Sequence, residues 1–313
     1  MITVKNLTKR FGPTVAVDNI SFEVQKGEIL GFLGPNGAGK STTMKILTCY
    51  MPPDEGKATL AGLDTFEDSL KIREKIGYLP ENTPLYNDMG TVDYLKFIAE
   101  VRKIPRSDRS KRLKEVTQLC GLGKEVLIKN IGQLSKGYRQ RVGLAQALIH
   151  NPDILIFDEP TTGLDPNQII EIRSMIKEIG KEKTVILCSH ILPEVQATCN
   201  RIIIIKDGKI VGSGTPEELA AQAQGEEIVY ITIHGPEDMI RQKLDSLDYI
   251  QEYRMLTSED GNCSRYEIKS PKGLDIRRSL FQVVADNKWS LSELHRTQIT
   301  LEDVFKQLTT EEN

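Results

Sequence analysis

The sequence predicts an α/β fold over about the first 220 of its 313 residues, followed by a smaller α+β domain. Short apolar runs that predict strands alternate with segments of helical periodicity, which favours a layered fold with parallel strands. One apolar run leads into a glycine-rich turn that opens a helix. After a polar stretch at residues 220–227, which we interpret as a linker, a second series of strands and helices begins.

The composition limits the class of protein. A chain of 313 residues that is 39% hydrophobic can bury a large core and a second, smaller one. The formal charge of −3 gives no bulk attraction to nucleic acid, so we expect no nucleic-acid partner. The basic stretch at residues 103–114 contains Asp108 and is followed by Glu115, which favours a solvated helix face. Five scattered cysteines without metal-ligand spacing favour free thiols in a reducing cytoplasm.

No segment predicts insertion into a membrane. Residues 1–5 lack the apolar core of a signal peptide. The run Ile202–Ile205 ends at Lys206, far short of the roughly 20 apolar residues that cross a bilayer. We therefore expect that the chain does not span a membrane by itself.

The first domain, residues 1–222, is expected to contain a mixed sheet and a helical subdomain. Strands are predicted at residues 2–4, 21–24, 29–33, 154–157, 184–187 and 201–205. Helices are predicted at residues 41–50 and 167–179, with a mostly helical region from about 90 to 150. Asp207-Gly208 predicts a hairpin turn. Thr215-Pro216-Glu217-Glu218 predicts the capped start of a helix.

The second domain, residues 223–313, has a pattern of its own. Strands and helices follow in the order βαββαβ, at residues 228–233, 238–247, 249–256, 263–268, 274–287 and 289–294. A short helix at residues 301–308 ends the chain. This order is the split βαβ arrangement of ferredoxin-like domains.

Residues Gly34 to Ser41 form a phosphate-binding pattern, because they fit G-x-x-x-x-G-K-[ST] between a strand and a helix. Glycines let successive backbone N–H groups converge on anionic oxygens, and the helix adds its positive N-terminal end. In this pattern Lys40 contacts the β- and γ-phosphates, and the Ser41 hydroxyl binds Mg²⁺. The pattern predicts a site for ATP and magnesium.

A second pattern is the apolar run at residues 154–157, which ends in Asp158 and Glu159. A buried strand would deliver both carboxylates to the sheet edge at which open α/β folds bind ligands. Asp158 is then a candidate for holding Mg²⁺ through water. Glu159 is a candidate general base for the attacking water. An apolar strand that ends in two acids is common, so this prediction depends on the phosphate-binding pattern beside it.

Five motifs in a fixed order resemble the ATP-binding cassette (ABC) family over about the first 220 residues. They are the phosphate loop, the signature Leu134-Ser135-Lys136-Gly137-Tyr138, Asp158-Glu159, the D-loop Gly163-Leu164-Asp165, and Ser189-His190. The resemblance implies that two cassettes pair head to tail and that each signature closes on the ATP of its partner. It also implies that His190 contacts the γ-phosphate and orients water with Glu159.

The resemblance further implies a nucleotide-binding set that includes an aromatic residue for adenine. The set is Phe11, Gly34, Pro35, Asn36, Gly37, Ala38, Gly39, Lys40, Ser41 and Thr42. From the sequence alone, Phe11 could instead be a core residue of a strand. Three positions depart from the family pattern: Lys136 replaces a glycine, Tyr138 a glutamine, and Glu81 the glutamine of the Q-loop. Glu81 could bind Mg²⁺ or couple the cassette to a membrane subunit.

Glu81, the Lys-Gly-Tyr signature and the ending Thr300–Phe305 resemble the ATP subunits of ABC-2-type exporters. This branch implies a motor subunit that works as a homodimer or with a related cassette, on a separate ABC-2-type permease at the cytoplasmic face of the membrane. The alternatives are a cassette ATPase of translation or DNA repair, or an ATP-sensing regulator. The single phosphate loop and the absence of sustained heptads disfavour the first two. The presence of both Glu159 and His190 disfavours the third.

Overall fold

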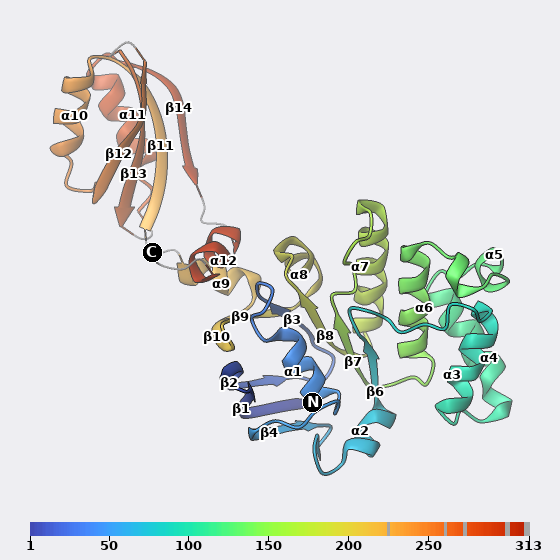
Figure 1. The fold of residues 1–313 in the computed structure, drawn as a ribbon. Helices are drawn as coiled ribbons and strands as arrows, with labels where there is room; N and C mark the ends of the chain where they lie inside the picture. Colours follow the sequence, from blue (N-terminus) through green and yellow to red (C-terminus); the bar gives the residue numbers. More distant parts are fainter. Residues whose placement is uncertain (224–225, 260–261, 272–273, 298–300, 310–313) are drawn as a thin grey trace. The chain divides into compact units, whose positions relative to one another are not determined.

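The computed structural model describes residues 1–223, 226–259, 262–271, 274–297 and 301–309. The chain divides into two compact units (Figure 1). The first comprises Met1–Pro216 and Phe305–Asn313, and the second comprises Glu217–Val304. The sequence analysis groups all residues from 223 onward, whereas this division assigns those from Phe305 to the first unit.

The first unit is built on a six-stranded sheet in the order β10-β9-β3-β8-β7-β6. Its strands are β3 (Ile29–Leu33), β6 (Ile76–Leu79), β7 (Ile154–Asp158), β8 (Thr184–Ser189), β9 (Arg201–Lys206) and β10 (Lys209–Gly214). Neighbours are parallel except for β9 and β10, which form a hairpin. Every residue of β3, β7 and β8 is buried, as expected for apolar parallel strands covered on both faces. Because β3, β7 and β8 are parallel, their carboxyl ends lie at one edge of the sheet.

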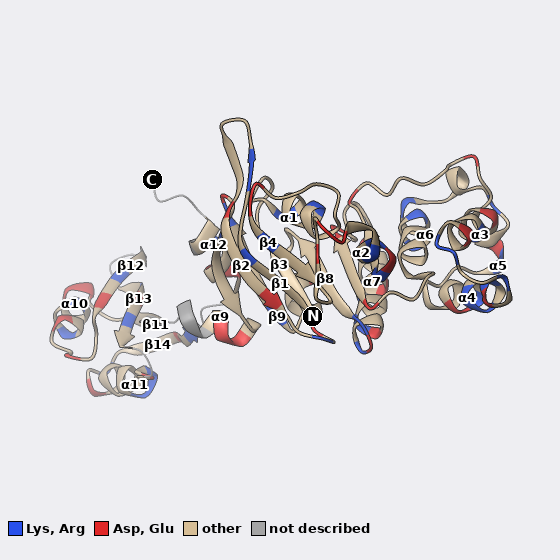
Figure 2. Cartoon of the chain, turned by 90° about the horizontal axis from the view of Figure 1, so that it is seen from below, with Lys and Arg blue, Asp and Glu red and all other residues tan. Residues whose placement is uncertain are grey.

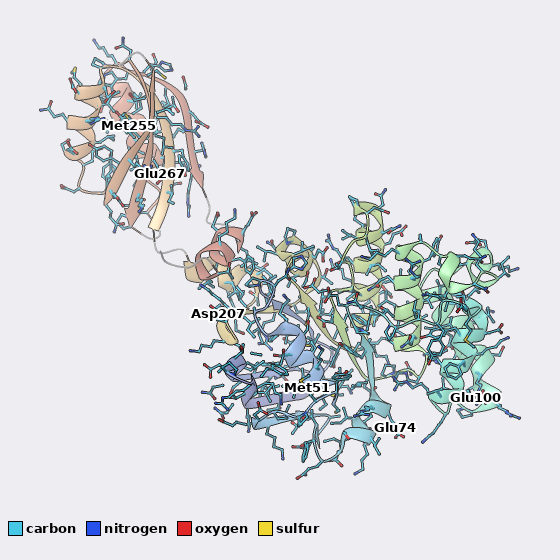
Figure 3. All side chains as sticks on the ribbon, viewed as in Figure 1. Met51, Glu74, Glu100, Asp207, Met255 and Glu267 are labelled. Carbon is cyan, nitrogen blue, oxygen red and sulfur yellow. The ribbon has the colours of Figure 1, made fainter. Side chains whose placement is uncertain are left out.

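The β9–β10 turn confirms the predicted hairpin. Asp207, which is labelled in Figure 3, and Gly208 have φ angles of 48° and 76°. Positive φ at both central residues is what a type I′ turn requires, and Asp-Gly is a preferred pair for it.

A second sheet of the first unit is antiparallel, in the order β2-β1-β4-β5. Its strands are β1 (Ile2–Phe11), β2 (Thr14–Val24), β4 (Glu55–Leu60) and β5 (Leu63–Asp64). The sequence analysis predicted parts of β1 and β2 and missed β4 and β5. One hydrophobic core joins both sheets to helix α1 (Lys40–Leu47), through residues such as Val4, Phe32 and Met44.

The remaining helices of the first unit include a helical subdomain, which Figure 1 shows beside the β6 end of the large sheet. Its helices are α3 (Thr91–Val101), α4 (Arg106–Leu119), α5 (Lys124–Leu127) and α6 (Lys136–Leu148), preceded by a 3₁₀ turn at Ile131–Gln133. Outside it lie α2 (Ser69–Lys75), α7 (Pro166–Gly180) and α8 (Leu192–Thr198). Helix α4 carries both basic and acidic residues (Figure 2), and Arg109 of α4 lies 3.3 Å from Glu100 of α3.

The second unit contains a four-stranded antiparallel sheet in the order β12-β13-β11-β14. Its elements are α9 (Pro216–Ala223), β11 (Glu226–His234), α10 (Glu237–Asp245), β12 (Glu252–Glu259), β13 (Cys263–Pro271), α11 (Arg277–Asp286) and β14 (Ser290–Thr297). Helix α12 (Leu301–Thr309) begins in the second unit and continues from Phe305 in the first. A separate core includes Ile231, Tyr266 and Leu280.

The expected linker at residues 220–227 is wrong in extent. Helix α9 continues to Ala223 and strand β11 begins at Glu226, with residues 224–225 outside the described part. Alanine and glutamine, which make up residues 220–223, are good helix formers, so α9 extends through them.

Two further properties are not confined to one unit. No helix in the described ranges combines the length and the apolar composition that a bilayer crossing needs. All five cysteines are free, and four of them are buried.

Candidate nucleotide site

The phosphate loop connects β3 to α1 at the carboxyl edge of the large sheet. Gly37 and Gly39 have φ angles of 83° and 103°, which favour glycine. A side chain at Gly39 would also overlap the carbonyl oxygen of Ala16. The loop is thus held close to β2. The N-terminus of α1 lines a cleft at the sheet edge, as an anion site requires.

Lys40 lies almost fully buried at the start of α1. Its ammonium group donates to the carbonyl oxygens of Gly34 and Pro35, at 2.7 and 3.1 Å. It also lies 3.6 Å from Oε1 of Glu159, whose side chain is equally buried. A buried cation at this position has its charge partly satisfied by the loop itself and remains within reach of a phosphate.

Asp158 and Ser41 come together from β7 and α1. The Ser41 hydroxyl lies 3.3 Å from Oδ1 of Asp158. Burial raises the pKa of Asp158, and the nearby Glu159 and Glu81 carboxylates raise it further. The structure therefore gathers hard oxygen donors at one place, which is the donor set that Mg²⁺ prefers.

Glu159 follows β7 directly and faces His190, which follows β8. Oε2 of Glu159 lies 2.9 Å from Nδ1 of His190, and the Thr162 hydroxyl lies 3.4 Å from the same oxygen. Glu159 has a φ of 52°, a conformation that costs about 1–3 kcal/mol in a non-glycine residue and gathers at functional sites. Because β7 and β8 are neighbours, residues 31 positions apart meet at the sheet edge.

A cleft of about 540 Å³ connects these groups. Its walls comprise Asn36, Gly37, Gly39, Lys40, Ser41, Thr42, Glu81, Glu159, Thr162 and His190. Six of the ten predicted nucleotide-binding residues are thus wall residues, while Gly34, Pro35, Ala38 and Phe11 are not among them. The cleft brings together a cation, a carboxylate–imidazole pair and a turn of backbone N–H groups, which suits a polyphosphate.

The structure also informs the role of Phe11, which the sequence left uncertain. Phe11 ends β1 with 49% of its surface exposed, so it is not a core residue. The contact of Phe11 with adenine stays a prediction. Thr162, which contacts Glu159, was missed by sequence reasoning, although it stands only three residues after Glu159.

Comparison with known proteins identifies the family. The ABC transporter family model matches residues 17–162. The linearmycin resistance ATP-binding protein LnrL of Bacillus subtilis (strain 168) is 32% identical over 99% of this chain and 98% of its own length. The chain belongs to the ABC transporter family. It is an ATP-binding cassette ATPase, as the sequence analysis predicted.

Other relatives and solved cassettes agree. The ABC transporter ATP-binding protein NatA of the same organism is 35% identical over 74% of this chain and 96% of its own length. The dimeric structure of the bacterial ABC transporter cassette MJ0796 has a TM-score of 0.64 and 28% identity. It covers 69% of this chain and 98% of that cassette. The solved cassettes thus support the ABC fold over the larger part of the chain.

The ABC signature lies apart from the cleft in the same cassette. Ser135 precedes α6, and its hydroxyl accepts from the Tyr138 N–H at 3.4 Å. Leu134 is buried, and a side chain at Gly137 would overlap Gln168 of α7. No signature residue is a wall residue of the 540 Å³ cleft. Within one cassette, the signature therefore does not complete the phosphate site.

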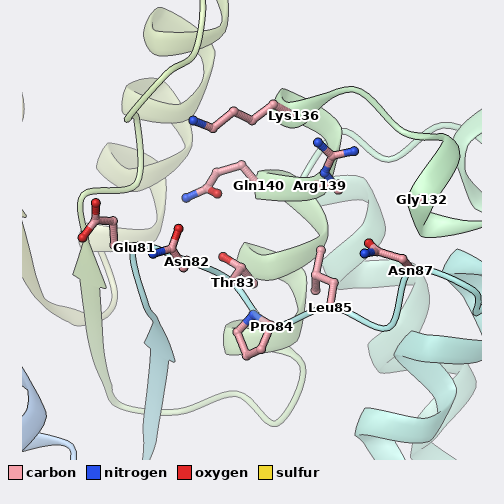
Figure 4. A pocket seen from close by; sticks show the side chains of 10 residues that line it. All are labelled: Glu81, Asn82, Thr83, Pro84, Leu85, Asn87, Gly132, Lys136, Arg139 and Gln140. Atoms are coloured by element: carbon pink, nitrogen blue, oxygen red, sulfur yellow. The ribbon is translucent and has the colours of Figure 1, made fainter.

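A neighbouring cleft of about 630 Å³ lies between the Q-loop and α6, the helix that follows Ser135. Figure 4 shows Lys136, Arg139 and Gln140 on α6 facing the segment that begins at Glu81. Glu81 lines both clefts, so it lies between the cleft at the phosphate loop and the helical subdomain.

The D-loop lies between β7 and α7. Gly163 has a φ of 72°, and a side chain there would run into the Lys136 ammonium group. Asp165 caps α7 by accepting from the Gln168 N–H at 3.0 Å, and the Leu164 N–H donates to the Thr161 carbonyl at 3.2 Å. Lys136, a departure from the family pattern, therefore reaches the D-loop of its own cassette.

Proposed function

We propose that this cassette is the motor subunit of an exporter. Two copies close on ATP and magnesium at the cytoplasmic face of the membrane, and a separate ABC-2-type permease converts this motion into transport. The observation that carries the hydrolytic part of the proposal is the Glu159–His190 pair at 2.9 Å, placed in one cleft with Lys40.

The hydrolytic step uses groups of the cassette that are already in place. Lys40, now bonded to loop carbonyls, would contact the β- and γ-phosphates. Glu159 would accept a proton from the water that attacks the γ-phosphate, while His190 holds that carboxylate and the water in position. Ser135 and Gly137 of the second copy would close the site with N–H and hydroxyl donors at the start of α6.

Ser41 and Asp158 would hold Mg²⁺, with Glu81 as a further candidate, because all three offer hard oxygens beside the phosphate loop. The bound ion would neutralise charge that develops on the phosphates. The 3.3 Å separation of the Ser41 and Asp158 oxygens fits this shared role.

The export function is supported by the name of the relative LnrL, a linearmycin resistance protein that this chain matches along nearly its full length. Contact with a permease is supported by an aromatic cluster at the start of the helical subdomain. The exposed ring of Tyr86 lies 5.7 Å from that of Tyr94 and 5.9 Å from that of Phe97. Exposed aromatic residues are frequent at protein interfaces.

Membrane fractionation with matched variants tests the coupling. Phe97→Ser should release the cassette from membranes that contain its permease and leave the basal ATPase rate of the purified protein unchanged. Ile170→Ser is the control, because Ile170 is also exposed but lies on α7, outside the helical subdomain. Equal membrane association of both variants would contradict the proposed contact surface.

We also propose that residues 223–313 act as an accessory domain that stabilises the dimer or regulates turnover. The separate core and the βαββαβ order of the second unit support this view. The unit contains none of the five ABC motifs.

A further inference from the structure

Glu194 is a buried carboxylate behind the nucleotide cleft. It lies on α8, and only 5% of its surface is exposed. Its Oε2 atom accepts from the Thr161 hydroxyl at 2.5 Å and from the Ser189 hydroxyl at 3.3 Å. Within the described part of the chain, its Oε1 atom has no hydrogen-bond partner and no cation pairs with it. Glu194 lines neither of the two clefts around the site.

The two hydroxyl groups belong to the two segments that carry Glu159 and His190. Thr161 follows Glu159 by two residues, and Ser189 directly precedes His190. The Ser189 hydroxyl also accepts from the Ile191 N–H at 3.0 Å, which closes a turn around His190. One carboxylate oxygen therefore fixes both ends of the Glu159–His190 contact.

This arrangement is unfavourable for stability alone. A buried carboxylate that has only neutral hydroxyl donors is poorly compensated for its lost hydration. Its second oxygen is unpartnered among the described residues, so that oxygen has lost its hydration without gaining a hydrogen bond. An apolar residue of similar size would suit the core better. The strained φ of Glu159 requires firm support from its surroundings, and Glu194 supplies part of it.

We propose that Glu194 is a positioning residue for ATP hydrolysis. It holds the segment after β7 and the turn after β8 in register, so that the Glu159 carboxylate and the His190 ring meet. The proposal rests on the roles assigned above to Glu159 and His190. Glu194 itself contacts neither nucleotide nor water in the reaction.

Steady-state kinetics of Glu194→Gln tests the proposal in the full-length protein. The neutral amide is a weaker acceptor for both hydroxyls, so kcat should fall about 10- to 100-fold through misplacement of the pair. KM for ATP should stay within twofold, because Glu194 touches no phosphate. The melting temperature should hold or rise, since a buried charge is removed. Thr198→Val is the control: the Thr198 hydroxyl is on the same helix, buried, and unpartnered among the described residues, so kcat should not change.

A second measurement reports position without turnover. The chain has four histidines, so the His190 ring resonance can be assigned by NMR with His190→Ala. Glu194→Gln and Ser189→Ala should both shift that resonance in the nucleotide-free protein, while Thr198→Val should not. Thr161→Val should lower kcat and Thr161→Ser should restore it, which keeps the test valid if Glu194→Gln folds poorly.

Two results would overturn the proposal. The first is a kcat of Glu194→Gln within twofold of wild type with an unmoved His190 resonance. The second is a parallel loss of kcat and melting temperature, with Thr161→Val as active as Thr161→Ser, which would assign Glu194 to the fold alone. Failure of the proposed function is distinguishable from both, because Glu159→Gln would then still hydrolyse ATP.

Discussion

The two units differ in whether their charged side chains are buried or lie at the surface. Within the described residues, the buried charged side chains are Lys40, Asp158, Glu159 and Glu194, all in the first unit and all at or behind the nucleotide cleft. In the described part of the second unit, the buried polar residues are Ser264 and Ser270. Burying a charge is costly unless it is paired. Charged groups that are buried despite this cost are typical of functional sites. The described part of the second unit contains no buried charged side chain.

The charges of the second unit pair on its surface instead. Tyr230 donates to Glu267 at 2.7 Å, and Lys269 lies 2.8 Å from Glu252. An ion pair at the surface such as Lys269–Glu252 contributes about 0–1 kcal/mol. Substitutions of the buried charged residues in the first unit should therefore change ATP hydrolysis. Substitutions of the surface pairs in the second unit should have little effect on it.

The largest expected effect is that of Glu159→Gln. A neutral amide cannot accept the proton of the attacking water, so kcat should fall by about 10²-fold or more. ATP binding should persist, and an ATP-bound dimer should accumulate on gel filtration. The matched variant in the second unit, Glu267→Gln, should hydrolyse ATP at the wild-type rate. Near-normal turnover by Glu159→Gln would remove the role assigned to that carboxylate.

Lys40→Ala should act on binding as well as turnover. Loss of a charge-assisted contact of about 1.5–3 kcal/mol corresponds to roughly 10- to 100-fold weaker ATP binding. Titration with a fluorescent ATP analogue measures this effect. Lys269→Ala removes a half-buried lysine of the second unit and serves as the control. If both variants bound the analogue like wild type, Lys40 would not contact the phosphates.

The smallest expected effect on ATP binding is that of truncation after Gln224. The first unit has its own core, so the shortened chain should fold and bind ATP. Dimerisation or the rate of hydrolysis should fall if the accessory domain contributes to either. A small loss of thermal stability is expected too, because the cut also removes residues from Phe305, which cluster with the first unit. An insoluble product, or one without nucleotide binding, would place the domain boundary elsewhere.

Local signals in the sequence were sufficient for much of this structure. Three features could be predicted because each is set by residues adjacent in the sequence. They are the glycine pattern before Lys40, the apolar runs of β3, β7 and β8, and the Asp207-Gly208 turn. Strand β4 escaped prediction because only Ala58 and Leu60 are buried in it, which is too little for a pattern.

The residues of the site could be predicted from the sequence, but the contacts between them could not. Glu159 and His190 each stand in a recognisable motif, but their 2.9 Å contact arises from the pairing of β7 with β8. Glu194 joins Thr161 across 33 positions and has no motif of its own. Such contacts depend on the packed sheet edge and leave no local pattern in the sequence.

The central claim is that two copies complete each other's ATP site, and subunit mixing tests it most directly. Ser135→Arg and Glu159→Gln should each be inactive alone, because every site in either dimer lacks a signature or a base. The two proteins are mixed without nucleotide, and ATP hydrolysis is then measured. In a mixed dimer, the intact Glu159 of one copy faces the intact Ser135 of the other.

We predict that the mixture regains about a quarter of wild-type activity, since half of randomly paired two-fold dimers are mixed and each has one intact site. A mixture as inactive as its two components, although gel filtration shows that mixed dimers form, would contradict a site shared between copies.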